Sequence, residues 1–448
     1  MKKANYRIAP MAGSIVLNVR GGVKLHVPRA IDQITPYVLL EQDDWFEDEI
    51  RFVRAALRPG QKAIDIGANH GVYAAAIASA VGPAGVVWAF EPTPQTADLL
   101  AESLRPYPQA RLLRNAVSNA EGTAHLRVSA ESESNALVDA AQSGTLAVPA
   151  QTPDRLAAEL GWRGVDFLKI DAEGHEAAIV EGGKAFFANE SPLVMLEVAH
   201  DRSAVERLRA QGYSAYRLLP GPLLLVPVAP GEALDPLQLN LFCCKPDRAR
   251  RLAAEGFLAP EPAPAAPADE IALYRIAMDR ARLPEERFGA LRGALELSVA
   301  DASPALPRLM SRIRVARDAG ARTLAYESAK RLFAEFPRRW REAVGAPFLA
   351  PLHRLDAVAA DGEDLEWLAC AAAETVIDLI AYSTKFAAPS LTRVIAMLDG
   401  NPFRSPMTER RRQLMRMTAG LQAGPQRHPL LETASGENLN PAYWRGES

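Results

Sequence analysis

The chain has 448 residues, of which 48% are hydrophobic and 23% are charged, as is typical of ordinary globular domains. At roughly 150 residues per domain, this length suggests two or three domains. Lys and Arg total 51 against 54 Asp and Glu, a net charge of −3, so the composition does not favour a nucleic acid as the partner. Three cysteines and the lack of a long uncharged apolar run lead us to expect a cytoplasmic protein without a membrane span.

Short apolar strands alternate with amphipathic helices before residue 259. The pattern predicts a strand over 22–28 and a helix over 43–57, with Asp44 and Glu47 as its capping pair. Further strands and helices are predicted over 62–66, 71–81, 86–90, 94–104, 111–117, 123–128, 153–160, 165–170, 175–188, 193–198 and 204–211. Residues 130–150 are expected to form a loop.

The order of these elements indicates an α/β fold. Strands joined by helices form a mostly parallel sheet with helices on both faces. Three late strands, over 213–219, 223–228 and 239–244, have no helices between them. We therefore expect one edge of the sheet to be antiparallel.

The sharpest change in composition is the run APEPAPAAP at 259–267. Its prolines exclude a helix and favour an extended, semi-rigid spacer. We therefore predict a first domain over 1–258, a linker over 259–268 and a helical domain over 269–448.

Residues beyond the linker show only helical periodicity. Helices are predicted over 269–281, 284–299, 305–318, 323–335, 338–344, 363–382, 389–398 and 407–421. The stretch 309–337 loosely resembles a tetratricopeptide unit, with Gly320 at the turn between two helices and Pro337 at the end. Ala325 and Ala329 would lie on the packed face. No second unit in register is visible, so an irregular helical bundle stays open as the alternative.

The strongest chemical signal is the sequence AIDIGANHGVY at 63–73. A strand ends near Asp65, and a loop with Gly67, Asn69 and Gly71 leads into a helix. Glycines let the backbone bend sharply and let a ligand approach it. The free N–H groups at the start of the helix suit a carboxylate or a phosphate. These four residues are therefore candidates for binding a cofactor.

A ribose site is indicated on the next strand. Glu91 follows Gly71 by twenty residues and ends the strand VWAFEP, where a carboxylate can accept hydrogen bonds from ribose hydroxyls. Asn115 lies at the end of the third predicted strand, where an adenine ring could pack. Together these residues indicate a ligand that contains a nucleoside.

A second motif, DFLKIDAEGHE at 166–176, places acidic residues at another strand end. Asp171 and Glu173 follow the strand directly, and Glu197 ends the next strand. Ligands bind open α/β sheets at this edge, so the three carboxylates could act as a general base or hold a divalent metal. The alternative is that they only cap the following helices. Lys169 would share a face with Asp171.

Two histidines and an acidic run are weaker candidates. His70 and His175 each lie in one of the motifs, and either could be a base or a ligand. A single histidine in a loop is, however, more often solvated or hydrogen-bonded. The acidic run, EQDDWFEDE at 41–49, contains Trp45 and Phe46. We interpret this acidic run as a solvated helix face with two buried aromatic rings.

These motifs resemble those of the FkbM family of S-adenosylmethionine-dependent methyltransferases. The similar stretches are Asp65–Tyr73, Phe90–Pro92 and Lys169–Glu176, within a resemblance that covers about 35–245. The resemblance implies a class I methyltransferase (Rossmann-like) fold with a seven-stranded sheet whose final strand is antiparallel. It also implies that S-adenosylmethionine lies over the first glycine loop with its ribose on Glu91. Family members usually methylate hydroxyl oxygens of polyketide-type metabolites or bacterial glycans.

We therefore expect an O-methyltransferase that acts on a hydroxyl of a small molecule or a glycan. Asp171 is the first candidate for the base, followed by Glu173 and Glu197, and a divalent metal would use Asp171 and Glu173. The candidates for binding the cofactor are Asp65, Gly67, Asn69, Gly71, Glu91 and Asn115. Residues that face the acceptor are expected in 130–150 and in the N-terminal segment.

Two other functions stay open at this point. A nucleotide-linked oxidoreductase would need a G-x-G-x-x-G loop, but Asn69 stands at the position of the middle glycine. A methyltransferase-like scaffold would act through protein contacts of the helical domain, and the intact motif residues argue against it. The helical domain itself could recruit the substrate, a protein partner or a second copy of the chain.

Overall fold

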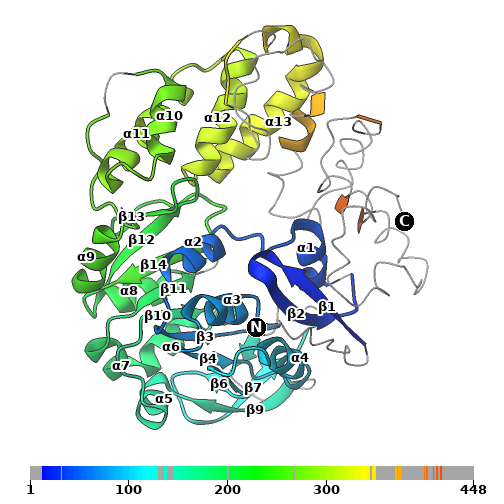
Figure 1. The fold of residues 1–448 in the computed structure, drawn as a ribbon. Coiled ribbons are helices and arrows are strands. Elements are labelled where there is room, and N and C mark those ends of the chain that lie inside the picture. The colour runs from blue at the N-terminus through cyan, green and yellow to red at the C-terminus, as the bar shows by residue number, and fades with distance from the viewer. Residues whose placement is uncertain are drawn as a thin grey trace, which may run out of the picture.

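The computed structural model describes most of the chain up to residue 349 and short stretches beyond it (Figure 1). The described residues are 13–31, 33–129, 136–138, 145–198, 201–265, 268–343, 346–349, 369–370, 372–375, 398, 400–401, 407, 410–411 and 414–415. A sheet covered by helices forms the lower body in Figure 1, and the later helices stack above one edge of it.

The central sheet contains eight described strands in the order β13-β12-β14-β11-β10-β3-β4-β5. Their bounds are β3 Lys62–Ile66, β4 Val86–Phe90, β5 Ala110–Leu113, β10 Phe167–Ile170, β11 Leu193–Glu197, β12 Ser214–Leu219, β13 Leu224–Val228 and β14 Asn240–Cys244. Strands β5, β4, β3, β10 and β11 are parallel, whereas β14 is antiparallel to both β11 and β12. The expected mostly parallel sheet with an antiparallel edge is confirmed.

The described sheet has one strand more than the resemblance implied. Strand β13 pairs with β12 in an antiparallel hairpin and forms the edge of the sheet. Leu224 and Val226 of β13 are fully buried, because they pack against helices from the C-terminal part of the chain. Those helices therefore stabilise the eighth strand.

Two apolar cores lie on the two faces of the sheet. Helices α5 (Pro153–Leu160), α6 (Glu176–Gly182), α7 (Lys184–Asn189) and α8 (Ser203–Arg209) pack on one face. Helices α2 (Glu49–Ala56), α3 (Val72–Val81) and α9 (Pro246–Ala254) pack on the other. Alternate residues of β3 serve the two cores, with Ile64 and Ile66 in the first and Ala63 in the second. The single helix expected over 175–188 is divided at Gly183.

The N-terminal part forms a hairpin of β1 (Ser14–Val19) and β2 (Val23–Pro28), joined by a 3-10 turn at Arg20–Gly22. With α1 (Ile34–Gln42) and α4 (Pro94–Leu104), this hairpin encloses a separate apolar core. The helix expected over 43–57 is wrong in its first half. Asp43 has a left-handed φ of 61°, which ends α1, and helical structure begins again only at Glu49.

A second sheet consists of β6 (Ala116–Val117), β7 (Gly122–Arg127), β8 (Ala136–Val138) and β9 (Thr145–Gln151), in the order β6-β9-β7-β8. The loop expected over 130–150 is therefore wrong for the residues of β8 and β9. Both strands pair with β7 in antiparallel register. Leu126 and Val148 bury their side chains in a small core, so long-range pairing stabilises strands whose own pattern is weak.

The C-terminal part contains α10 (Glu270–Met278), α11 (Pro284–Val299), α12 (Leu306–Asp318), α13 (Arg322–Arg339) and a 3-10 turn at Trp340–Ala343. We call the described residues from 268 onward the helical region. Gly320 turns the chain between α12 and α13 with a φ of 74°, and Ala325 and Ala329 are buried as expected.

Pro337 lies inside α13 instead of ending it, and the helix expected over 338–344 is only the end of α13 and the following turn. A tetratricopeptide repeat is therefore not confirmed. The later predicted helices lie mostly outside the described residues, at 363–382, 389–398 and 407–421.

The helical region packs directly on the sheet. Leu224 of β13 and Leu291 of α11 belong to one apolar core, and Arg287 donates a hydrogen bond to the carbonyl of Pro222 at 2.6 Å. The proline-rich linker lies along α11. The N–H of Ala263 in the linker donates a hydrogen bond to the carbonyl of Glu285 in α11 at 2.9 Å. The exact domain boundaries stay a prediction.

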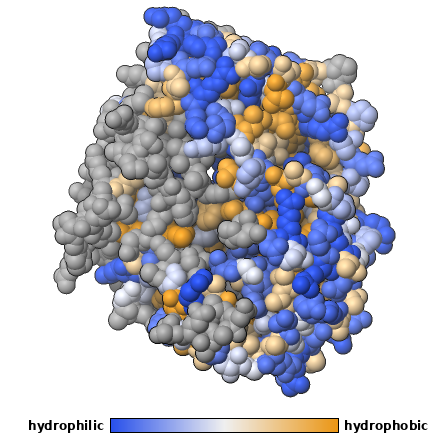
Figure 2. Space-filling model, turned by 180° about the vertical axis from the view of Figure 1, so that it is seen from behind, coloured by the Kyte–Doolittle hydropathy of each residue, from blue (hydrophilic) through white to orange (hydrophobic). Residues whose placement is uncertain are grey.

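None of the described helices is long and apolar enough to cross a membrane. On the face shown in Figure 2, hydrophilic and hydrophobic residues are interspersed, and hydrophobic residues gather over the upper part of the molecule. The three cysteines are free thiols with buried side chains, at Cys243, Cys244 and Cys370.

The contact between the linker and α11 predicts that replacing a glycine of α11 by alanine destabilises the protein. A Cβ at Gly289 would lie 1.8 Å from the carbonyl oxygen of Ala263. Gly289→Ala should therefore lower the free energy of unfolding by roughly 1–3 kcal/mol, although alanine ordinarily favours a helix over glycine. Urea unfolding measures the effect. Gly293→Ala, with its nearest atom at 3.1 Å, is the matched control and should cost less. A Gly289→Ala protein as stable as the wild type would contradict this packing.

Candidate functional site

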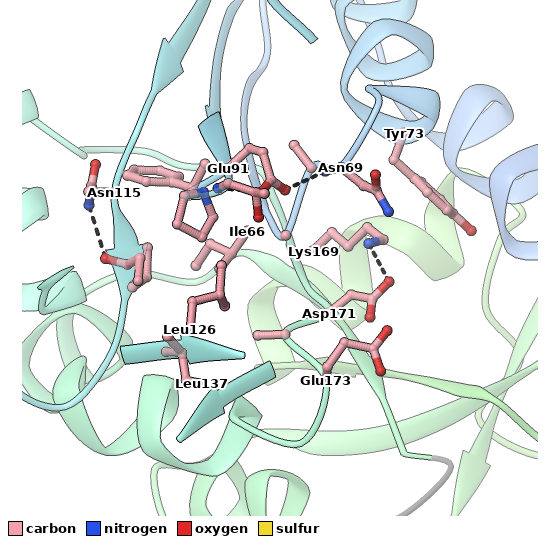
Figure 3. A pocket seen from close by; sticks show the side chains of 18 of the residues that line it. Ile66, Asn69, Tyr73, Glu91, Asn115, Leu126, Leu137, Lys169, Asp171 and Glu173 are labelled. Carbon is pink, nitrogen blue, oxygen red and sulfur yellow. Dashed lines mark hydrogen bonds and ion pairs between the residues drawn. The ribbon is translucent and has the colours of Figure 1, made fainter. Parts of the chain in front are cut away.

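A cavity opens at the carboxyl ends of β3, β4 and β10 (Figure 3). About 940 Å³ of it is free of protein atoms, including the part open to solvent. The residues that line it are Thr35, Trp45, Ile66, Gly67, Ala68, Asn69, Val72, Tyr73, Phe90, Glu91, Pro92, Thr93, Asn115, Ala116, Val117, Leu126, Leu137, Lys169, Asp171, Ala172 and Glu173. The cavity thus brings both sequence motifs together with the N-terminal part and the second sheet.

The structure divides the predicted site residues into two groups. Those that line the cavity are Gly67, Asn69, Glu91, Asn115, Asp171 and Glu173. The cavity lining does not include Asp65, Gly71 or Glu197. Each of these three has a different physical role, which its contacts identify.

The glycines of the first loop serve packing. Gly67 has a φ of 80°, and a Cβ there would lie 1.8 Å from the carbonyl oxygen of Asp171. Close approach of the two motif loops therefore requires this glycine, whereas the sequence suggested close approach of a ligand. Gly71 has a φ of 93°, and a Cβ there would lie 2.7 Å from Leu100 Cδ1 of α4. Packing between helices explains Gly71 and its place outside the cavity.

The carboxylate of Glu91 is held in place by backbone N–H groups. One oxygen accepts a hydrogen bond from the N–H of Thr93 at 2.8 Å, and the other accepts from the N–H of Asn69 at 3.1 Å. Burial raises the pKa of Glu91 above its usual value, and these donors offset part of that effect. The Thr93 side chain also hydrogen-bonds this carboxylate. Because an ionised carboxylate can accept about four hydrogen bonds, Glu91 keeps capacity for a hydroxyl group of a ligand.

One end of the cavity combines polar edges with an apolar wall. Asn115 lies between β5 and β6, beyond the end of the third strand where the sequence placed it, and its Nδ2 donates to the carbonyl of Ala116 at 3.0 Å. Leu126 of β7 and Leu137 of β8 form the wall of this end of the cavity (Figure 3). The Oδ1 of Asn69 is buried without a hydrogen-bond partner in the described structure. A flat heteroaromatic ring would fit these surroundings.

A buried ammonium group joins the two motifs. The Nζ of Lys169 lies 2.8 Å from Oδ2 of Asp171 and 3.9 Å from Oδ1 of Asp65, and the lysine side chain is only 4% exposed. Burial lowers the pKa of Lys169, but the negative charges of Asp171 and Asp65 outweigh it and raise the pKa well above its usual value. Burial also raises the pKa of Asp65 to about 6. Asp65 therefore balances the charge of Lys169 and is not among the cavity-lining residues, whereas the sequence suggested a contact with the cofactor.

Three carboxylates gather at the other end of the cavity. Asp171, Glu173 and Glu197 each offer an oxygen atom within 4.8 Å of the others. Burial, together with the charges of Asp171 and Glu173, raises the pKa of Glu197 to about 9. Glu197 is therefore protonated near neutral pH, which reduces the repulsion in the cluster. The cluster can accept a proton or supply oxygen ligands to a divalent cation.

The sequence missed part of the cavity wall. Thr35 and Trp45 line the cavity but lie outside both motifs. Tyr73 lies in the first motif without a predicted role, and its hydroxyl donates a hydrogen bond to Glu47 at 2.5 Å. The tryptophan inside the acidic run is the one signal in the sequence that could have pointed to this wall.

The interpretation of the acidic run as a solvated helix face is wrong. Asp44 and Glu49 are buried. Asp44 accepts two hydrogen bonds from Arg54, at 2.7 and 2.8 Å, so it forms an ion pair and does not cap a helix. Burial and the charges of Glu47 and Asp48 raise the pKa of Glu49 to about 8. Trp45 and Phe46, expected to be buried, are only half-buried. The acidic run is therefore partly buried, and through Trp45 it forms part of the cavity wall.

The two motif histidines have structural positions. His70 is 2% exposed and is not among the cavity-lining residues. The Nε2 of His175 lies 2.8 Å from the hydroxyl of Ser118. Neither position indicates a catalytic role.

Comparisons with known proteins agree with the motifs. Residues 65–215 match the family model described as Methyltransferase FkbM domain. No curated protein matches the chain.

The chain is similar to several solved structures. One is an FkbM methyltransferase from Methylobacillus flagellatus KT, with 15% sequence identity and a TM-score of 0.28; the match covers 43% of this chain and 50% of that chain. A SAM-dependent O-methyltransferase from Thermotoga maritima has 12% identity, a TM-score of 0.27 and coverage of 53% and 94%. Fibrillarin from Aeropyrum pernix, solved with bound S-adenosyl-L-methionine, has 10% identity, a TM-score of 0.27 and coverage of 53% and 96%. Because these scores are low, the similarity to a family rests on the match over residues 65–215.

The burial of His70 predicts a loss of stability in acid. Burial lowers the pKa of His70 to about 4 from an ordinary value of 6.5. The unfolded chain therefore binds a proton that the folded protein excludes, and stability falls as the pH drops from the unfolded value toward the folded one. Between about pH 7 and pH 5, the free energy of unfolding should therefore fall by on the order of 1–2 kcal/mol less in His70→Gln than in the wild type. Urea unfolding at both pH values measures it, and equal losses in the two proteins would contradict a neutral buried His70.

Proposed function

We propose that this chain is an S-adenosylmethionine-dependent O-methyltransferase, because residues 65–215 match the family model of the FkbM methyltransferase domain. Its acceptor is a hydroxyl group of a sugar, a glycan or another secondary metabolite. The observation that carries the proposal is the fixed, buried carboxylate of Glu91, which faces a cavity with an apolar wall at one end and carboxylates at the other.

The two ends of the cavity fit the two halves of such a cofactor. Glu91 would accept a hydrogen bond from a ribose hydroxyl, and the adenine would lie beside Asn115 against Leu126 and Leu137. The cofactor supplies the reactive methyl group, so the protein chiefly contributes orientation and exclusion of water.

The carboxylate end supports proton removal from the acceptor. A neutral alcohol is a poor nucleophile, so its proton must leave as the new oxygen–carbon bond forms. Asp171 is the favoured base because Lys169 fixes its position at 2.8 Å, and Glu173 is the second candidate. Glu197, which hydrogen-bonds Asp171, would support this base. A divalent metal on Asp171 and Glu173 would instead lower the pKa of the hydroxyl group.

The proposal includes the surroundings in which the enzyme acts. A small molecule or a glycan needs no strongly basic surface, in keeping with the net charge of −3. We place the protein in the cytoplasm and leave the outer surface of the helical region available to a protein partner. A methyltransferase-like scaffold is the competing function, and it predicts that no cofactor binds.

Cofactor binding gives the first test. The wild-type protein should bind S-adenosylhomocysteine in calorimetry and should not bind NAD. Glu91→Ala should weaken S-adenosylhomocysteine binding by roughly 1–3 kcal/mol, the value of a hydrogen bond to a charged group. Glu102→Ala, which removes a carboxylate that pairs with Arg105 on α4, is the matched control and should bind normally. Lack of binding by the wild type would favour the scaffold, and normal binding by Glu91→Ala would refute the ribose site.

Methyl transfer gives the second test. Asp171→Asn should bind S-adenosylhomocysteine within about threefold of the wild type but reduce turnover by roughly 100-fold or more, because it removes a base and not a cofactor contact. Extracts of cells that express either protein are compared by mass spectrometry for a species that gains the mass of one methylene group. Full methylation with Asp171→Asn would exclude Asp171 as the base. Loss of wild-type activity on chelation, and its return with Mg²⁺ or Mn²⁺, would favour the metal.

A further inference from the structure

We propose that the helical region is a structural part of the cofactor cavity, because its arginines hold the acidic run 41–49 in place as a cavity wall. The inference rests on the proposed function only in its use of S-adenosylhomocysteine as a probe. Arg322, Arg410 and Arg411 are positioning residues in this arrangement, since they act on the cavity through Trp45 and Glu47.

The acidic run reaches the cavity at two points. The side chain of Trp45 lines the cavity, and the carboxylate of Glu47 accepts the hydrogen bond of the Tyr73 hydroxyl at 2.5 Å. Tyr73 in turn lies under the ammonium group of Lys169, at 4.9 Å from the ring centroid. Displacement of the acidic run would therefore disturb both the open wall and the charged group beside Asp171.

Two arginines near the C-terminal end of the described residues hold the first part of the acidic run. The guanidinium of Arg411 lies 3.1 Å from the carboxylate of Glu41, and the two side chains are 5% and 0% exposed. Arg410 forms an ion pair with Asp43, the residue whose left-handed φ of 61° ends α1. Leu414 is fully buried in the same apolar core as the N-terminal hairpin. Figure 1 shows orange elements of this part of the chain near α1.

A third arginine contacts the other end of the acidic run. Arg322, at the start of α13, lies 3.9 Å from the carboxylate of Asp48. The adjacent Thr323 is fixed to the sheet domain, since its N–H and its hydroxyl both donate hydrogen bonds to Asp235, at 2.9 and 2.7 Å. The start of α13 is therefore a rigid support for Arg322.

The middle of the acidic run is held from within the sheet domain. Arg54 of α2 binds Asp44 with two hydrogen bonds, at 2.7 and 2.8 Å, and the N–H of Trp45 donates to the same carboxylate at 2.9 Å. The helical region thus adds contacts at both ends of a segment that is already fixed at its centre. Loss of the end contacts would loosen the segment without unfolding the sheet.

Hydrogen exchange and calorimetry on the full chain test this inference. In the double variant Arg410→Ala with Arg411→Ala, the amides of 41–49 should exchange roughly tenfold faster while those of β3 and β10 keep wild-type rates. The affinity for S-adenosylhomocysteine should fall by about threefold or more. Arg292→Ala removes an exposed ion pair with Glu296 and should change neither quantity.

Removal of Arg411 leaves a buried carboxylate, and such losses can unfold a protein. Arg322→Ala, at a longer contact of 3.9 Å, keeps the test available in that case and should produce the same pattern with a smaller change. Unchanged exchange at 41–49, equal acceleration across β3 and β10, or unchanged affinity in a loosened variant would each overturn the inference. A wild-type protein that binds no S-adenosylhomocysteine would reject the proposed function, and the exchange rates would still decide whether the arginines hold the acidic run.

Discussion

The rest of the site depends on the buried ion pairs of Lys169. An ammonium group in a sheet interior costs several kcal/mol unless it is paired, and here Asp65 and Asp171 provide the opposite charge. Lys169 stands opposite Asp65 in the parallel pairing of β10 with β3. The charge therefore fixes the register in which both strands end, and Gly67 lets the following loops pack against each other. Cofactor and acceptor chemistry can meet at one edge because this register brings the two motifs together.

The sequence was sufficient where local signals agreed. Strands β3, β4, β10 and β11 are short, mostly apolar runs, and a helix follows each of them. Their positions could therefore be predicted, together with the candidates Glu91, Asp171 and Glu173, which directly follow β4 and β10. The second sheet could not, because β8 is stabilised by its pairing with β7 and not by its own pattern. The end of α1 at Asp43 was also hidden, since its partner Arg410 lies 367 residues away. Asp65 and Gly67 were predicted as cofactor contacts. Their other roles, the charge balance with Lys169 and the close approach of the two motif loops, depend on tertiary packing that the sequence does not show.

The parts of the chain before and after the proline run pack against each other in the described residues. The linker packs on α11, and Leu224 of the sheet shares a core with Leu291 of the helical region. The eighth strand of the sheet is covered by that same core. Removal of the helical region would therefore expose β13. It would also remove the ion pairs of Arg410 and Arg411 with the acidic run.

The distance in sequence between the acidic run and its arginines has a consequence for biosynthesis. The ion pairs of Arg410 and Arg411 close over 367 and 370 residues, whereas most of the cavity comes from a stretch that leaves the ribosome much earlier. Contacts of such high sequence separation form late. The nascent chain would pass through a stage in which the sheet and both motif loops exist while one wall is still unsecured. Tight retention of the cofactor would then begin only after Arg410 and Arg411 have been synthesised.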